Sequence, residues 1–440
     1  MPRTAVGGQA VPGPIPRVFF ADRVPRPHSS PYVSVPEPSA TRRCERLGTR
    51  SPAGRARPPS GRPSACASEC AAVRGVATGV NSSLAPQRRL RGVRLSVLDR
   101  SSVRGDQDPA AALRDTVDFA RSIEDLGYHR FWVAEHHSVP GVAGSAPTVL
   151  AAAVAAATSR IRVGTGGVML PNHQPLVVAE QFGVLDALYP GRIDMGLGRS
   201  LAFTAGIRRA LERDKRAADD FPDQLARLLG FIGGDQTDDP GVHAIPGEGG
   251  AVAPFLLATG EGSVIAAEAG LPLVIAPIAG FDRMTELIER YRERFRPSRW
   301  AERPYTVVSA TVAAAATAAE AYRLLVPEAW SYAYARTHAE FPPLRPAEEI
   351  LARDMTERER ARFDEALSGH VHGTGDQVAD ELGSLVDRTG ADEVLVTLST
   401  YDRAAMLDSY ARLARLTGAA PAAGGGAGRA GRTAAQASGR

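Results

Sequence analysis

Short apolar runs alternate with longer segments of helical periodicity through the middle of this chain. A short apolar run suits a strand buried on both faces, and the helical segment after it supplies the crossover to the next parallel strand. The pattern therefore predicts an α/β protein with a parallel sheet. The runs that qualify as strands are residues 94–99, 129–135, 161–170, 192–198, 254–260, 271–277, 305–315 and 393–399. Eight parallel strands with helices between them are typical of the (β/α)8 TIM barrel, although periodicity alone leaves a doubly wound open sheet as an alternative.

Helix signals support the same alternation. After the first strand, Asp108 and Pro109 predict a helix start and Gly127 its end. A small-residue helix is expected to begin near Ser145, and two more are expected over residues 175–188 and 262–270. Each of these helices follows a predicted strand, as a barrel requires.

Both ends of the chain differ from the middle in composition. Residues 1–92 form a basic leader rich in Pro and Arg, with few periodic apolar positions, and residues 418–440 form a Gly/Ala-rich tail. Such segments bury too little apolar surface to offset their ordering entropy, so we expect both to be disordered. The leader resembles a transit peptide in its composition, but a translation start placed too far upstream is the explanation that we favour. Residues 93–417 are left as the one folded domain.

Charge and cysteine usage exclude several functions. Residues 1–90 hold fourteen arginines against four acidic residues, so the body of the chain is acidic and gives no indication of nucleic-acid binding. All three cysteines lie in the leader, which leaves the body without a thiol nucleophile. No apolar run reaches the roughly 18 residues that cross a bilayer. We expect a cytoplasmic protein without a membrane anchor.

Polar residues follow the second predicted strand directly. The run "FWVAEHH" ends in Glu135, His136 and His137, which a barrel would place at the carboxyl ends of its strands, where barrel enzymes carry their sites. Glu135 and His137 share one side of an extended segment and His136 takes the other. An imidazole there suits proton transfer near neutral pH. An ordinary polar loop is the alternative, and we expect no metal because three consecutive ligands fit one ion poorly.

Glycines interrupt or end two further strands. Gly166 and Gly167 lie inside a strand, where they cost stability unless something must approach the backbone closely; a strand bulge is the alternative. Gly198 and Arg199 follow the fourth strand, where a guanidinium could bind a phosphate through two hydrogen bonds.

A second candidate phosphate-binding turn precedes a helix. Thr259, Gly260 and Ser263 bring hydroxyl and backbone N–H groups to the start of the helix expected over 262–270. Taken singly, this turn and the one at Arg199 are more simply explained as ordinary strand-to-helix connections. Two such turns in one barrel, together with an arginine, predict a cofactor that bears a phosphate group.

Five segments, taken in order, resemble the luciferase-like flavin-dependent monooxygenase family, and especially its bacterial single-chain branch found in biosynthetic clusters. They are "LSVLD", "GYHRFWVAEHH", "IRVGTGGVMLPNHQPLVVAEQFGVLDALYPGRIDMGLGR", "AAEAGLPLVIA" and "HGTGDQVADEL". The resemblance covers nearly all of residues 93–417. It implies a TIM barrel that binds reduced FMN, or in some relatives the deazaflavin F420, at the carboxyl ends of the strands.

The resemblance also implies roles for individual residues. His136 would be the catalytic histidine, Arg199 the phosphate-binding arginine, and Gly166–Gly167 the site of a cis peptide beneath the flavin ring. The turn from Thr259 to Ser263 matches the family's phosphate-binding turn less closely. Gly198 stands where bacterial luciferase has a reactive cysteine, which argues against light emission.

The implied activity is oxidation of a small organic substrate with O2 and reduced FMN from a separate flavin reductase, in secondary metabolism. F420-dependent hydride transfer without O2 and a flavin-binding homologue without turnover are the alternatives. A homodimer, common among relatives, would suit the Ala-rich helix at residues 146–158. The charged segment 334–369 is either a lid that selects substrate or an exposed helical insertion.

Overall fold

The computed structural model describes residues 90–201, 204–278 and 280–418. Residues 1–89 of the predicted leader and 419–440 of the predicted tail lie outside the described residues, so the expectations for them stay predictions. The domain predicted over residues 93–417 falls within the described part of the chain, apart from residues 202–203 and 279.

Eight parallel strands close into a barrel, and the predicted fold class is confirmed. The strands follow one another around the barrel in the order β1, β2, β3, β5, β6, β7, β8 and β10, and β10 pairs with both β8 and β1 to close it. Their bounds are Arg94–Asp99 (β1), Arg130–Val133 (β2), Arg162–Thr165 (β3), Ile193–Gly198 (β5), Ala253–Leu257 (β6), Leu273–Ile275 (β7), Thr306–Ala314 (β8) and Glu393–Thr397 (β10). Because β10 pairs with both of its neighbours, the open sheet is excluded.

The third predicted strand differs in detail from the expectation. Instead of one strand over residues 161–170, the chain forms β3, breaks at Gly166–Gly167, and resumes as β4 (Val168–Met169), which also pairs with β5. A short strand that the sequence analysis did not predict, β9 (Val371–Gly373), pairs with the end of β8.

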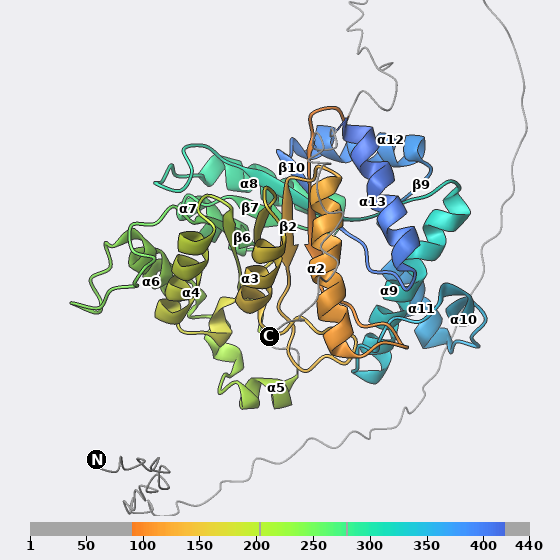
Figure 1. Cartoon of the computed structure of the whole chain (residues 1–440), viewed down its shortest axis with the longest axis horizontal. Coiled ribbons are helices and arrows are strands. Elements are labelled where there is room, and N and C mark those ends of the chain that lie inside the picture. Colours follow the sequence, from red (N-terminus) through yellow and green to blue (C-terminus); the bar gives the residue numbers. More distant parts are fainter. Residues whose placement is uncertain (1–89, 202–203, 279, 419–440) are drawn as a thin grey trace, which may run out of the picture. The chain divides into compact units, whose positions relative to one another are not determined.

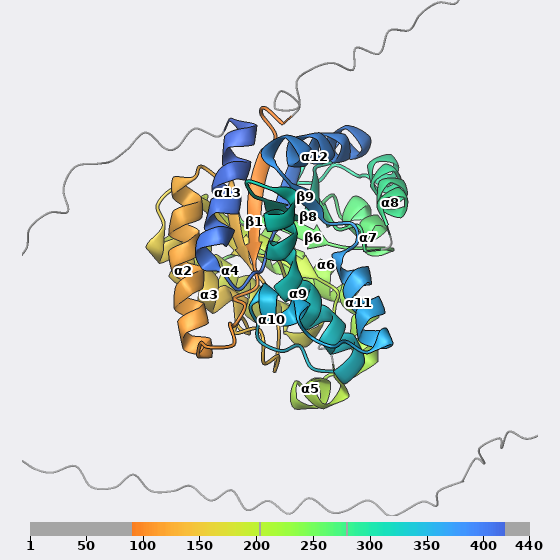
Figure 2. The same cartoon turned by 90° about the vertical axis from the view of Figure 1, so that its right-hand side faces the viewer.

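Helices surround the barrel, as Figures 1 and 2 show. The helix that follows β1 starts at Asp108 as predicted, since the Asp108 side chain accepts a hydrogen bond from the N–H of Ala111. The helix after β2 begins at Pro147 with Ala146 as its N-cap, one residue from Ser145, near which it was predicted to begin. The helices are α2 (Pro109–Asp125), α3 (Pro147–Ala157), α4 (Pro175–Leu188), α5 (Ala205–Ala210), α6 (Phe221–Gly233), α7 (Gly262–Glu268), α8 (Phe281–Arg294), α9 (Ala318–His338), α10 (Ala347–Leu351), α11 (Glu357–Leu367), α12 (Gly375–Thr389) and α13 (Arg403–Thr417).

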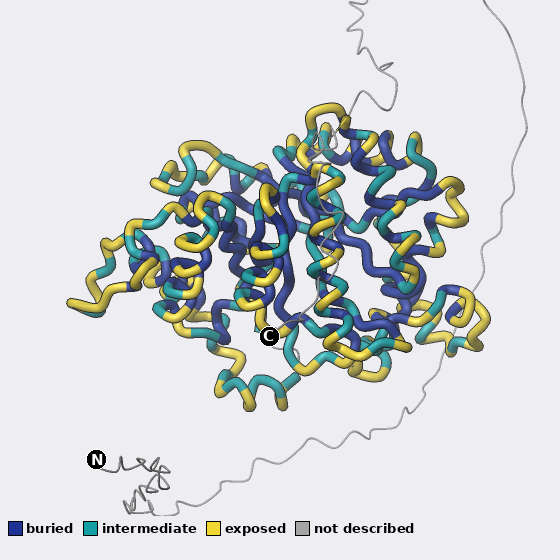
Figure 3. Tube along the Cα trace, viewed as in Figure 1, coloured by how far each residue is buried: buried dark blue, intermediate teal, exposed yellow. Residues whose placement is uncertain are grey.

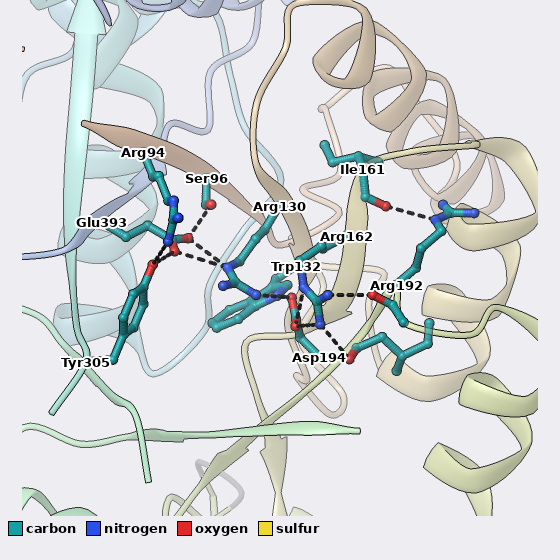
Figure 4. Close-up of polar contacts among 12 residues, drawn as sticks. Arg94, Ser96, Arg130, Trp132, Ile161, Arg162, Arg192, Asp194, Tyr305 and Glu393 are labelled. Carbon is teal, nitrogen blue, oxygen red and sulfur yellow. Dashed lines mark hydrogen bonds and ion pairs between the residues drawn. The ribbon is translucent and has the colours of Figure 1, made fainter. Parts of the chain in front are cut away.

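An ion-pair network fills the amino-terminal end of the barrel (Figure 4). Arg130 at the start of β2 donates from Nε to both carboxylate oxygens of Glu393, at 3.0 and 3.1 Å, and from Nη1 to Asp194 at 2.8 Å. Trp132 and Arg162 donate to the same Asp194 carboxylate. Both carboxylates are fully buried, so each depends on these donors to offset its lost hydration.

An apolar layer lies next to this network inside the barrel. Trp132, Phe255, Val274, Val307 and Leu395, from five different strands, form one buried cluster. The rings of Trp132 and Phe255 meet edge to face with centroids 5.1 Å apart. The ionic and apolar layers together fill the barrel from its amino-terminal end, so open space is available at the carboxyl ends of the strands.

The larger apolar core lies between the strands and the outer helices, where Figure 3 shows buried strands inside and exposed outward helix faces. Residues 347–351 and 357–367 form α10 and α11, which pack on α9 with Ile350 and Phe363 fully buried. The segment 334–369 thus includes two helices that pack on α9, and its role as a lid that selects substrate stays a prediction. None of the helices in the described residues is long and apolar enough to span a membrane.

Candidate active site

A cavity of about 850 Å³ opens at the carboxyl ends of the strands. Residues in or directly after all eight barrel strands line it, and its walls include backbone as well as side chains. The predicted site residues that line it are His136, Gly166, Gly167, Gly198, Arg199, Thr259 and Gly260. Segments far apart in the sequence therefore meet in one cavity, at the end of the barrel where the strand-end argument placed them.

Gly166 and Gly167 form one wall of this cavity, at the break between β3 and β4. The peptide bond between them is cis, as the resemblance implied. A Cβ on Gly167 would lie 2.8 Å from the carbonyl oxygen of Gly196 on the neighbouring β5, so no side chain fits there. The wall consequently presents bare backbone, which a planar ligand can approach closely.

Glu135 and His137 lie on one side of the segment after β2 and are hydrogen-bonded to each other, as the alternation predicted. The Glu135 carboxylate accepts from Nε2 of His137 at 2.7 Å, from Nε2 of His173 at 2.9 Å, and from the N–H of Met169 at 2.8 Å. Burial alone would raise the pKa of Glu135, but the two imidazole hydrogen bonds outweigh it and lower the pKa to about 2. This carboxylate ties the segment after β2 to the segment around β4.

These three side chains are also a set that could hold a metal ion. One ligand atom from each of Glu135, His137 and His173 lies within 4.8 Å of the other two. Sequence reasoning missed the set because His173 stands 36 positions beyond His137. The contacts between them are hydrogen bonds, and these already satisfy the carboxylate without an ion.

His136 takes the other side of the segment and faces the cavity. Burial, followed by the nearby positive charge of Arg100, lowers the pKa of His136 to about 4, so its imidazole is neutral at pH 7. Its Nδ1 is buried and has no hydrogen-bond partner within the described part of the chain. The partly buried ring lines the cavity, and a neutral imidazole there can exchange a proton or a hydrogen bond with a bound molecule.

Arg100, directly after β1, lines the cavity on the same side as His136. It forms an ion pair with Glu328 of α9, and its guanidinium carbon lies 6.0 Å from the centroid of the Tyr332 ring. Neither Arg100 nor Glu328 was predicted as a site residue from the sequence. The position of Arg100 directly after a predicted strand could have identified it as a candidate site residue. Its pairing with Glu328 could not be predicted, because the two positions lie 228 residues apart.

The two candidate phosphate turns lie at another part of the cavity rim, after β5 and β6. Arg199 is 46% exposed; its Nε donates to the carbonyl of Ala218 at 2.9 Å and its Nη2 lies 3.4 Å from Asp219. Thr259 and Gly260 line the cavity beside it. A Cβ on Gly260 would meet no atom within 4 Å, so the space above this turn is open.

Ser263 lies differently from the rest of the predicted set. Its side chain is fully buried, and its hydroxyl and its N–H both donate to the carbonyl of Gly260, each at 2.9 Å. Ser263 therefore holds the turn together from beneath, and it is not among the residues that line the cavity. Its predicted contact with a cofactor stays a prediction.

Comparison with known proteins gives one consistent family. A family model described as luciferase-like monooxygenase matches residues 93–393. The uncharacterized protein YvbT of Bacillus subtilis is 39% identical over 321 residues, which are 72% of this chain and 94% of that protein. A luciferase-like monooxygenase of Escherichia coli is 35% identical over 72% of this chain and 95% of that protein.

Solved structures agree with this result. The crystal structure of apo-MsnO8 has a TM-score of 0.67 and 32% identity, covering 76% of this chain and 99% of that one. The FMN complex of the oxygenating constituent of 3,6-diketocamphane monooxygenase from Pseudomonas putida has a TM-score of 0.57 and 18% identity, over 74% and 98% of the two chains. An F420-dependent secondary alcohol dehydrogenase has a TM-score of 0.56 and 13% identity, over 74% and 99%. At these last two identities the likeness shows the fold alone.

Proposed function

Because the chain belongs to the luciferase-like monooxygenase family, we propose that it uses reduced FMN and O2 to oxidise a small organic substrate. One observation carries the proposal: His136 and Arg199 open into a single cavity at the carboxyl ends of the barrel strands. A flavin mononucleotide needs that combination, with room for a planar ring and a cation for its phosphate.

The residues of the cavity fit this cofactor. Gly166 and Gly167 give a wall without side chains against which a flavin ring can lie. Arg199, with the turn at Thr259 and Gly260, supplies the guanidinium, hydroxyl and N–H groups that bind a phosphate. The present partners of Arg199, a carbonyl and an exposed carboxylate, are ones that a phosphate can displace. When bound, reduced FMN would supply the electrons that activate O2.

His136 is the proposed proton-transfer residue. Its neutral imidazole lines the cavity and its Nδ1 has no partner in the described residues. It accepts a proton or a hydrogen bond from the reacting oxygen or from the substrate, while the closed apolar floor of the barrel keeps water away. Glu135, bound to its own two histidines, holds the segment that carries His136 in place.

Replacing His136 with Ala tests this role. We expect turnover with reduced FMN to fall by about 10²- to 10⁴-fold, the usual contribution of one acid–base group, while FMN affinity changes little. His243→Ala is a matched control, because His243 is exposed and paired with Glu248 outside the cavity. Unchanged turnover of the His136 variant would contradict the assignment.

F420-dependent hydride transfer without O2 is the second candidate function. The observation that favours it is the shared fold of the F420-dependent secondary alcohol dehydrogenase. Titration of the protein with FMN, reduced FMN and F420, followed by an oxygen-electrode trace with the tightest binder, separates the two. O2 consumption with reduced FMN supports the monooxygenase. Oxidation or reduction of F420 without O2 supports the alternative, and binding of none of the three supports a homologue that has lost turnover.

We propose that a separate flavin reductase supplies the reduced FMN in the cytoplasm, and that the substrate comes from secondary metabolism. We also propose a homodimer. The outward faces of α3 and α4 expose Val149 (69%), Val177, Val184 and Leu188 (63%), an apolar surface of the kind that a second subunit covers. Light scattering should show a dimer that Val149→Asp weakens, and a monomer at micromolar concentration would contradict this.

A further inference from the structure

The side chain of Arg100 has an unused hydrogen-bonding edge. Its Nη1 donates to Glu328, and this is its only hydrogen bond with the residues that the structure describes. Nε and Nη2, which point to the same side of a guanidinium, are left without a partner. Two parallel N–H groups in this arrangement match the two oxygens of a carboxylate. The side chain is 19% exposed and lines the cavity, so a ligand can reach it.

Glu328 holds Arg100 in place from the side away from the cavity. The residue is 6% exposed, does not line the cavity, and its second oxygen accepts the N–H of Ser399 at 3.3 Å. Tyr332, one helical turn further along α9, lies against the guanidinium. The arginine is therefore oriented by its surroundings before any ligand binds, which lowers the entropy cost of binding one.

Arg100 is the guanidinium that lines this end of the cavity, and the acidic groups near it already have partners. Beside Arg100, His136 is neutral, and the carboxylate of Glu135 already accepts three hydrogen bonds. Glu261, the other acidic residue that lines the cavity, lies at the far turn and is paired with Arg290. Arg100 thus offers a ligand beside His136 two unused N–H donors, while the Glu328 carboxylate offsets its charge.

We propose that Arg100 binds a carboxylate group of the substrate and so directs the enzyme to anionic compounds. This proposal rests on the proposed function, in which the phosphate of FMN is bound by Arg199. Arg100 follows β1 and Arg199 follows β5, and β2 and β3 separate these strands in the barrel. One cation at each place would hold the cofactor by its phosphate and the substrate by its carboxylate, with His136 between substrate and flavin.

Calorimetric titration with matched acid and amide pairs tests the proposal. The probes are hexanoate against hexanamide and 3-phenylpropanoate against 3-phenylpropanamide, each added to the FMN-free and to the FMN-loaded protein. We expect each acid to bind about tenfold or more tightly than its amide, also with FMN bound, because only the acid forms charge-assisted hydrogen bonds with Arg100.

Three variants assign the preference to Arg100. Arg100→Gln alone would leave the buried Glu328 carboxylate without its cation and destabilise the protein, so Arg100→Gln is combined with Glu328→Gln. The double variant should lose the preference for acids and keep its affinity for FMN. Glu328→Gln alone should retain the preference, and Arg199→Gln should weaken FMN instead.

Several outcomes would overturn the proposal. They are equal binding of acids and amides, a preference that survives in the double variant, acids that compete with FMN, or a double variant that loses FMN affinity as Arg199→Gln does. Failure of the proposed function is a distinct result, because a protein that binds acids through Arg100 but binds no flavin contradicts only the flavin chemistry.

Discussion

The buried carboxylate of Glu135 gives a prediction whose size follows from its contacts. The change Glu135→Gln keeps the shape of the side chain but removes its charge. It also places an amide NH2 among three donors, namely Nε2 of His137, Nε2 of His173 and the N–H of Met169. At least one of these donors then loses its partner, and the others lose a charged acceptor.

The expected loss is about 3 kcal/mol of the free energy of unfolding at pH 7. The pKa of Glu135 falls from an ordinary 4.5 to about 2 on folding, and a tenfold change in proton affinity is about 1.4 kcal/mol. A lowered folded-state pKa stabilises the protein above the unfolded value and loses that effect as the pH falls through the folded value. The difference between the wild type and the variant should therefore shrink to about 2 kcal/mol at pH 3.5.

Urea denaturation of both proteins at pH 7, 5, 4 and 3.5 measures this difference. Glu124→Gln is the control, because its carboxylate also accepts three N–H groups, from Ser159, Arg160 and Ile161, but near the amino-terminal end of the barrel. That variant should lose stability without changing FMN binding or turnover. A difference below 1 kcal/mol at pH 7 for the Glu135 variant, or one that does not decrease as the pH falls, would refute the reasoning.

Three further predictions concern the barrel and the cavity. Arg130→Met should lower the free energy of unfolding by about 3–5 kcal/mol in urea titrations, because it leaves two fully buried carboxylates without their shared cation. Gly167→Ala should weaken FMN binding in a fluorescence titration, since its Cβ would meet the Gly196 carbonyl at 2.8 Å and displace the wall of the cavity. The matched control is Gly260→Ala, which should leave the backbone in place because the space around its Cβ is open. The rate of turnover should be constant from pH 8 down to about 5.5 and fall only as His136 protonates near its pKa of about 4; a decline centred near pH 6.5 would count against a neutral, buried imidazole.

Much of the barrel could be read from short-range patterns. The strand at residues 94–99 and the helix at 175–188 have the predicted bounds, because apolar run length and proline position are local signals. The break at Gly166–Gly167 differs from expectation. There the backbone of Gly167 lies so close to the Gly196 carbonyl of β5 that no Cβ fits, and no local pattern records that contact.

The candidate site was predicted in part for the same reason. Residues at strand ends, such as His136 and Arg199, could be identified because the fold itself gathers strand ends at one rim. The hydrogen bonds of Glu135 to His173 and of Arg100 to Glu328 could not, since no periodicity relates these positions. The orientation of Ser263, inward beneath its turn, likewise depends on which way the backbone carbonyl of Gly260 points.

By itself, the sequence determined the alternation of strands and helices, the family, and the set of strand-end residues from which a site can be built. Only the tertiary structure decided which of those residues share a cavity, which carboxylate neutralises which cation, and that the imidazole of His136 is partly buried near Arg100 and uncharged. The physical reason is that secondary structure follows from interactions over a few residues, which a pattern records. The charge state and partners of a buried polar group depend instead on its desolvation and on groups brought close from distant parts of the chain.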